Sequence, residues 1–162
     1  MKNLHLCTFF LCVCLLASAC RKGREEQVIA LPEVAKEGHM TGNIDSEQFT
    51  ASSLNASVNK YPNGTLELNV NGWNQPSDQT IYFSIQNYKG VDAYGIVPFT
   101  THEAKTTNAW YEKNHSNKVY SHSGMVIIQY ADPEMITGIY DFWINKTRIA
   151  GEFGIKPHYS DK

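Results

Sequence analysis

Apolar and polar residues alternate along much of the chain after residue 40, and this period of two predicts β-strands. Residues 65–71 (TLELNVN) and 80–86 (TIYFSIQ) each carry an apolar side chain at every second position. Successive side chains of a strand point to opposite faces, so both segments are expected to be half-buried strands. Asn63-Gly64, just before the first segment, is a strong signal for a tight turn.

Three further strands are expected near the C-terminus. Residues 124–130 (GMVIIQY) are apolar on both faces, which is typical of a central strand. Residues 135–144 (MITGIYDFWI) and 147–155 (TRIAGEFGI) follow, joined by a turn at Asn145-Lys146. Glycines in these last strands predict bulges or sharp bends; they are Gly138, Gly151 and Gly154.

Weaker patterns add shorter strands, and no segment has a convincing amphipathic helical period. The weaker strands are expected at 42–51, 53–59, 92–97, 109–113 and 119–122. About 8–10 short strands joined by short turns predict an all-β, antiparallel fold. Because consecutive hairpins dominate, a meander barrel is the preferred architecture, and a two-sheet β-sandwich is the alternative.

The N-terminus has the layout of a secretory signal. Lys2 is followed by an apolar run at 4–16, which is shorter than the roughly 20 residues needed to span a bilayer. Residues 16–20 (LASAC) resemble the lipobox of bacterial lipoproteins. In that family the cysteine thiol receives a diacylglyceryl group, the signal is cut before the cysteine, and the new amine is acylated. The alternative is an ordinary signal cut after Ala-Ser-Ala, with Cys20 as a spare thiol.

The resemblance implies an organisation of the chain in three parts. A signal peptide covers residues 1–19, a lipid anchor and linker cover 20–38, and a single β domain covers 39–162. The protein is then expected in the bacterial cell envelope, held by lipidated Cys20 to a membrane that faces the periplasm or the cell surface. Stable anchoring takes more than one acyl chain, and a lipoprotein cysteine carries enough of them.

Cysteine and charge exclude several kinds of chemistry from the β domain. All four cysteines lie within the first twenty residues, so residues 21–162 hold none for a disulfide, a thiolate nucleophile or a metal site. The chain has 14 basic and 16 acidic residues, and residues 1–19 contribute only Lys2 to these; 13 basic and 16 acidic residues remain, a net charge of −3. Phosphate neutralisation dominates nucleic-acid affinity, so we expect no nucleic-acid partner.

Several β segments together carry a family resemblance. They are 40–45 (MTGNID), 49–51 (FTA), 124–128 (GMVII), 136–142 (ITGIYDF) and 149–153 (IAGEF). With the lipobox, they resemble small exported bacterial lipoproteins of an uncharacterised all-β, lipocalin-like family. The resemblance implies a lipocalin-like or related all-β domain, and it brings no catalytic residues with it.

The sequence offers only weak candidates for a metal site and for a nucleophilic serine. A two-histidine metal site is conceivable if His115 and His122 face each other across a hairpin and His102 or Glu103 joins them; exposed loop histidines are the preferred interpretation. Residues 121–124 (SHSG) lack the Gly-x-Ser-x-Gly frame of a nucleophile elbow. We therefore expect no metal site, no catalytic residue and no cofactor.

Two acid pairs are candidates for glycoside cleavage, which needs two facing carboxyl groups. Asp132 with Glu134 lies in a predicted turn, and Asp141 with Glu152 lies on predicted strands. Turn residues and outward-facing strand residues are the preferred interpretations of both pairs, so neither is assigned to catalysis.

Aromatic residues are the most suggestive group for ligand binding. They are Trp73, Tyr82, Tyr88, Tyr94, Trp110, Tyr111, Tyr120, Tyr130, Tyr140 and Trp143. Most are expected in core or cross-strand packing. The alternative is a ring-lined cavity or a surface platform for an amphiphile or a sugar, and the adjacent pair Trp110-Tyr111 is the candidate binding pair.

The preferred function is a non-enzymatic binding or structural role for a β domain on a lipid tether, with a protein or a small amphiphile as the partner. The alternative is a carrier that holds a small apolar or amphiphilic ligand inside the barrel. A metal-assisted hydrolase is the least favoured of the three.

Overall fold

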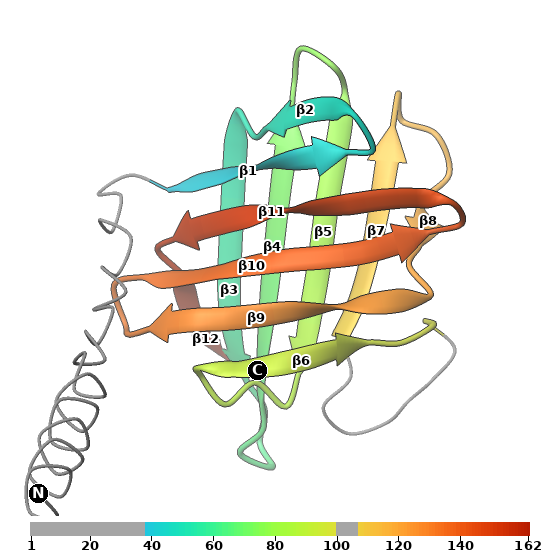
Figure 1. Cartoon of the computed structure of the whole chain (residues 1–162). Helices are drawn as coiled ribbons and strands as arrows, with labels where there is room; N and C mark the ends of the chain where they lie inside the picture. The colour runs from blue at the N-terminus through green and yellow to red at the C-terminus, as the bar shows by residue number, and fades with distance from the viewer. Residues whose placement is uncertain (1–37, 100–106) are drawn as a thin grey trace, which may run out of the picture. The chain divides into compact units, whose positions relative to one another are not determined.

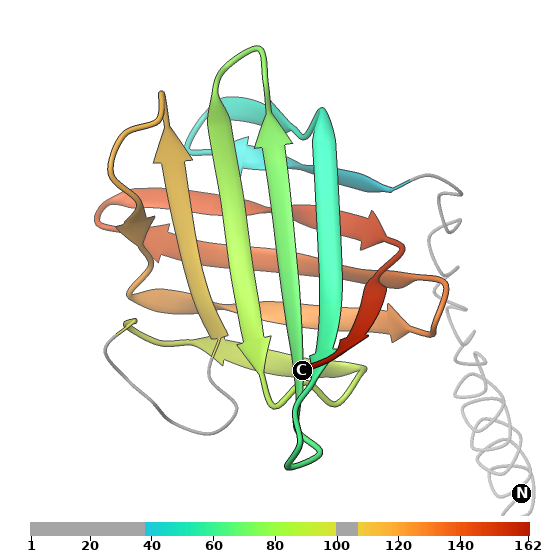
Figure 2. The same ribbon diagram turned by 180° about the vertical axis from the view of Figure 1, so that it is seen from behind.

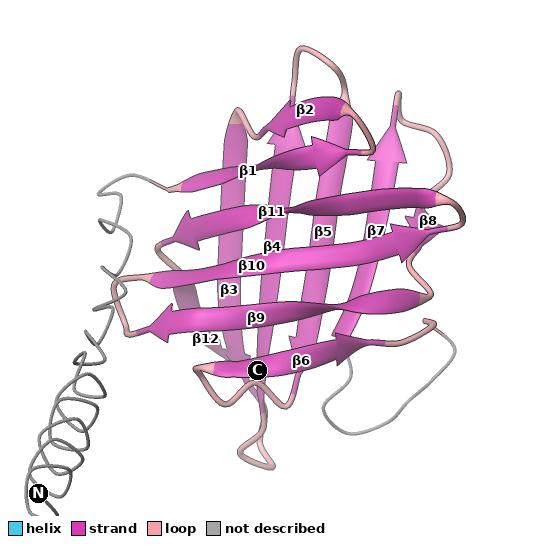
Figure 3. Cartoon of the chain, in the orientation of Figure 1, coloured by secondary structure: helices cyan, strands magenta, loops and turns pink. Residues whose placement is uncertain are grey.

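The computed structural model describes residues 38–99 and 107–162, and these residues form strands and loops (Figure 3). No helix in these ranges is long and apolar enough to cross a membrane. The predicted signal peptide and Cys20 lie outside the described residues. The strands are β1 His39–Ile44, β2 Glu47–Thr50, β3 Ser53–Lys60, β4 Leu66–Asn74, β5 Gln79–Gln86, β6 Asp92–Ile96, β7 Thr107–Lys113, β8 Val119–Tyr120, β9 Ser123–Ala131, β10 Ile136–Ile144, β11 Thr147–Ile155 and β12 His158–Asp161.

The strands belong to one sheet that curls over itself into two layers (Figures 1 and 2). One layer has the order β12-β3-β4-β5-β7, with β8 paired to β7; the other has the order β6-β9-β10-β11-β1-β2. The strands of one layer run across those of the other. The layers are joined where Ile96 of β6 pairs with Thr107 of β7, and the sheet stays open between its two ends, β2 and β12.

The prediction of an all-β, barrel-like fold is confirmed. Most neighbours in the sheet are consecutive antiparallel strands, as a meander requires. The other pairings depart from it. Because β6 lies in the second layer, β5 pairs with β7 and β6 with β9. β1 pairs with β11, and the pairings of β6 with β7 and of β12 with β3 are parallel. The described residues form twelve strands rather than about 8–10.

The additional strands have local causes. The segment 42–51, expected as one strand, contains the end of β1 and all of β2, because Asp45 adopts a left-handed φ of 53° and reverses the chain. The Asp45 carboxylate also accepts a hydrogen bond from the Arg148 backbone N–H at 2.9 Å. The C-terminal strand β12 is polar, and because it has no apolar alternation the sequence pattern did not predict it.

The apolar core lies between the two crossed layers. Its largest fully buried side chains are Tyr140, Phe49, Phe83, Phe142, Phe153, Met40, Leu68, Ile81, Ile85, Ile128, Ile136 and Ile149. The Phe83 ring from one layer lies 5.2 Å from the Phe153 ring and 6.2 Å from the Tyr140 ring of the other. Each such side chain contributes about 1.5–3 kcal/mol on burial, so this interior holds the layers together.

The glycines of β10 and β11 act as predicted in one place and differently in another. The pairing of β9 with β10 shifts register between Thr137 and Gly138, which is the expected bulge. Gly151 instead permits a close approach: it pairs with Gly42 of β1, and the Tyr140 hydroxyl lies beside both and donates to the Thr41 carbonyl at 3.1 Å.

We predict that Gly151→Ala destabilises the fold by about 1–3 kcal/mol, because overpacking a filled interior forces neighbours apart. A Cβ on Gly151 would lie 2.0 Å from the Thr41 carbonyl oxygen, which is backbone and cannot rotate away. Gly95→Ala is the matched control, since a Cβ there meets nothing within 4 Å. Urea unfolding of the three proteins tests this, and equal midpoints would contradict it.

Candidate functional site

The candidate pair Trp110-Tyr111 is divided between the two faces of β7. Neighbouring residues of a strand point in opposite directions, so the two rings cannot share one platform. Trp110 pairs across the sheet with Tyr82 and Tyr120 on the outer face, whereas Tyr111 packs against the buried core. The two residues therefore belong to different surroundings, and each is described with its own neighbours.

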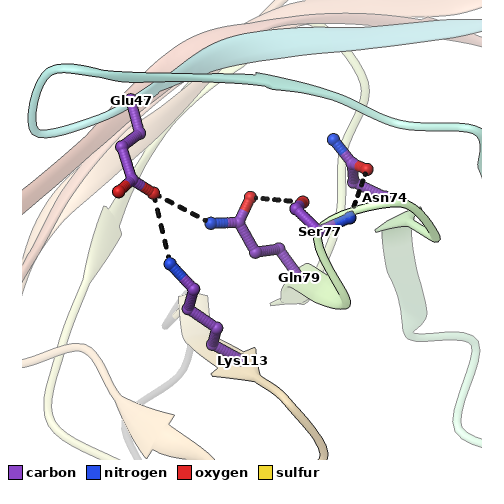
Figure 4. Close-up of polar contacts among 5 residues, drawn as sticks. All are labelled: Glu47, Asn74, Ser77, Gln79 and Lys113. Atoms are coloured by element: carbon purple, nitrogen blue, oxygen red, sulfur yellow. Dashed lines mark hydrogen bonds and ion pairs between the residues drawn. The ribbon is translucent and has the colours of Figure 1, made fainter.

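Tyr111 lies close to Gln79, which belongs to a polar cluster here called the polar cap (Figure 4). Glu47 of β2 accepts hydrogen bonds at 3.3 Å from Gln79 of β5 and from Lys113 of β7. Gln79 is buried and also accepts a hydrogen bond from the Ser77 hydroxyl at 2.8 Å. The cap satisfies a buried amide and joins the edge strand β2 to the opposite layer, which is a structural role.

The partners of Trp110 form a row of rings on the outer face. Tyr82, Trp110 and Tyr120 occupy one register line across β5, β7 and β8. The Tyr82 and Trp110 rings are stacked, with centroids 5.1 Å apart and an interplanar angle of 19°. The Lys118 ammonium lies 4.4 Å from the centre of the Trp110 ring, in a cation–π contact.

A cavity of about 390 Å³ opens beside this row. Here called the aromatic groove, it is lined by Glu67, Tyr82, Ser84, Gln86, Phe99, Asn108, Trp110, Lys118 and Tyr120. The Phe99 ring extends the row, since its centre lies 4.4 Å from that of Tyr120. Rings with uncharged amides and hydroxyls between them are the composition expected of a small-ligand site.

Glu67 is the most constrained polar group of the aromatic groove. Its carboxylate accepts hydrogen bonds from the Tyr61 hydroxyl at 2.8 Å, the Ser84 hydroxyl at 3.0 Å and the Asn59 amide at 3.4 Å. Burial by itself raises the pKa of Glu67, but the hydrogen bonds, Tyr61 first, outweigh it and lower the pKa below its ordinary value. The group is therefore an ionised acceptor at neutral pH.

The network around Glu67 continues to the C-terminal strand. The Asn59 side chain is buried and accepts a hydrogen bond at 2.7 Å from Ser160 of β12. A second cavity of about 260 Å³ adjoins the aromatic groove, because Glu67 and Gln86 line both. Its remaining lining residues are Tyr61, Asn63, Thr65, Leu66 and Asn87. The outer face thus carries two adjacent hollows that share one carboxylate.

Within the described residues, the side chains proposed for a metal site and for a serine nucleophile are not arranged as such sites require. His102 and Glu103 lie outside them. His115 faces Asp78, with 3.4 Å between Nε2 and Oδ1, and no group of three His, Cys, Asp or Glu within 38–99 and 107–162 is placed to hold a metal ion. Ser121 is buried, and its hydroxyl lies 3.0 Å from the carbonyls of Ser123 and Trp143, which is a structural contact.

The two acid pairs have the positions expected of turn and strand residues. Asp132 accepts hydrogen bonds from the Tyr130 hydroxyl at 2.5 Å and from two backbone N–H groups of its own turn. Asp141 pairs with Arg148 at 2.6 Å on the outer face, whereas Glu152 stands opposite Ile139. Asp132 and Asp141 each already have a hydrogen-bonding side-chain partner, Tyr130 and Arg148.

The alternation of apolar and polar residues contained information about this site that the prediction of Trp110-Tyr111 did not use. It already placed Glu67 and Tyr82 on the faces opposite to the apolar residues of their strands. What alternation could not supply was the pairing of β5 with β7, which brings Tyr82 beside Trp110. Lys118 and Asn108 carried no signal of their own, because a turn lysine and a strand asparagine are common.

The chain was compared with protein families, curated proteins and solved structures. No family model matches it, and neither the curated proteins nor the solved structures gave a match. The resemblance to exported lipoproteins therefore stays a prediction from the sequence.

We predict that Glu67→Gln lowers the stability by about 1–3 kcal/mol at pH 7, since it removes the charge from hydrogen bonds that are strongest to a carboxylate. The folded pKa lies below the ordinary value of about 4.3, so the ionised group stabilises the fold above that pH, and the contribution is lost as the pH falls below it. The difference between the two proteins should shrink from pH 7 to pH 3 in urea unfolding.

Tyr61→Phe provides the matched variant, because it keeps the ring and removes the leading hydrogen bond to Glu67. Its acid-dependent loss of stability should be smaller than that of the wild type. A constant difference between wild type and Glu67→Gln at every pH would contradict the role assigned to the carboxylate.

Proposed function

We propose that this protein is a lipid-anchored binding protein of the bacterial envelope, and that its ligand occupies the aromatic groove. The anchor follows from the lipobox-like residues 16–20 and lipidation of Cys20. The observation that carries the binding role is the register row of Tyr82, Trp110 and Tyr120 beside a hollow of about 390 Å³. A volume of this size lies within the range of pockets for small molecules, roughly 300–1,000 Å³.

Binding rather than turnover is supported by the state of Glu67. A general acid needs a raised pKa so that it holds a proton at neutral pH. Hydrogen bonds lower the pKa of Glu67, and three side chains of the fold engage its oxygens. The carboxylate accepts hydrogen bonds from neighbouring side chains. Because it is ionised at neutral pH, it has no proton to donate.

The packing favours the outer face over the barrel interior as the place of the ligand. The space between the layers holds the large buried side chains of the core, among them Phe83, Phe153 and Tyr140. A carried ligand would have to displace them, and protein interiors are close-packed. The carrier alternative therefore requires a rearranged core, whereas the groove is already open.

The anchor is tested by Cys20→Ser in the full chain, expressed in a bacterial host. We expect the wild type to partition into the detergent phase and to carry the added mass of the acyl groups in intact-mass spectrometry. Cys20→Ser should lose both, because the lipid supplies the membrane affinity. Equal partitioning of the two proteins would contradict lipidation at Cys20.

The binding role is tested by native mass spectrometry of the full chain, purified in mild detergent from the envelope of its own host. We expect a noncovalent adduct that Trp110→Ala loses. Trp143→Ala is the matched control, because Trp143 is an exposed tryptophan, 41% accessible, on β10 of the opposite layer. A wild-type chain with no adduct, or one that both variants keep, would contradict a ligand site at the aromatic groove.

A further inference from the structure

The lining of the aromatic groove restricts the chemistry of its ligand. Its two charged side chains are already engaged: Glu67 accepts hydrogen bonds from the fold, and Lys118 lies over the Trp110 ring. The remaining polar groups of this groove are amides and hydroxyls. The carboxylate of Glu67 and the ammonium of Lys118 cancel in formal charge among the described lining residues, so an uncharged polar ligand fits best.

Asn108 has a side-chain acceptor that a ligand could satisfy by donating a hydrogen bond. Its side-chain oxygen is buried and has no hydrogen-bond partner among the described residues. The residue lines the groove next to Ser84, with which it pairs across β5 and β7. An unsatisfied buried acceptor is unfavourable, and a ligand hydroxyl would satisfy it once the amide turns its oxygen into the groove.

The adjacent positions of the two hollows favour an extended ligand. The aromatic groove, of about 390 Å³, and the adjoining cavity, of about 260 Å³, share Glu67 and Gln86. They extend from β8 across the outer face to the turn that contains Asn63. Both hollows are lined by aromatic rings and hydrogen-bonding groups, and their combined length suits a chain of several linked rings more than one compact molecule.

Three other classes of ligand fit less well. A peptide strand would need a free backbone edge, but β4, β5 and β7 are each hydrogen-bonded to strands on both sides. A nucleic acid would need basic residues for its phosphates, and the groove lining includes a single lysine. An acyl chain would leave the amides and hydroxyls unpaired.

We propose that the aromatic groove binds an oligosaccharide of uncharged sugar units. A pyranose ring presents C–H groups to aromatic side chains, and its hydroxyls both donate and accept hydrogen bonds. One such ligand can therefore satisfy the acceptor of Asn108, the amide of Gln86 and the rings of the aromatic row together. The inference rests on the proposed binding function and specifies the ligand class for that same site.

The test is a glycan array carrying neutral oligosaccharides beside sulfated and uronic-acid oligosaccharides. The full chain, solubilised in mild detergent, is applied as wild type, Trp110→Ala, Asn108→Ala and Trp143→Ala. We expect the wild type and Trp143→Ala to bind neutral oligosaccharides. Trp110→Ala should lose binding by about tenfold or more, as expected for a central aromatic contact, and Asn108→Ala should weaken it in the same direction.

Three results would overturn the proposal: no binding to neutral oligosaccharides, binding to the acidic ones alone, or neutral binding that Trp110→Ala leaves unchanged. Native mass spectrometry separates this failure from that of the binding function. A Trp110-dependent adduct that proves to be a peptide or a lipid would overturn the sugar assignment and leave the binding site standing. The absence of any Trp110-dependent adduct would overturn both.

Discussion

The structure depends on the burial of one apolar face of a single sheet against itself. Among the described strands, the two layers pair with each other only where Ile96 of β6 meets Thr107 of β7, so strand pairing by itself joins the layers weakly. Contacts such as those of Phe83 with Phe153 hold the crossed strands together. Because the inward side chains of the middle strands pack in the core, the outer faces of the layers are the surfaces open to a ligand.

The close approach of β1 and β11 follows from the same constraint. Curling a sheet over a filled interior brings some backbones nearer than a side chain permits, and Gly42 opposite Gly151 gives that room. Tyr140 fills the space above the glycine pair and satisfies its own hydroxyl on the Thr41 carbonyl. The polar cap performs a comparable task at the edge, where Glu47 reaches the opposite layer.

The candidate ligand site is a consequence of this architecture. With β6 in the other layer, β7 lies beside β5, and their outward residues Tyr82 and Trp110 become neighbours. The Glu67 network anchors the far side of the groove through Asn59 and Ser160, so the C-terminal strand also supports it. The paired strands fix the backbone positions of these residues before a ligand is present, which favours binding by a preformed surface.

The sequence by itself determined the strands with strong alternation, the face each turns inward, and the turns at Gly64 and Asn145, because these depend on local periodicity and backbone conformation. It also placed Trp110 and Tyr111 together as one candidate site, although alternation separates them. Only the tertiary structure decided which strands are neighbours. Ring stacking, the Glu67 hydrogen bonds and the hollow beside them depend on pairs distant in the chain, and a period of two along one strand carries no information about the register of the next.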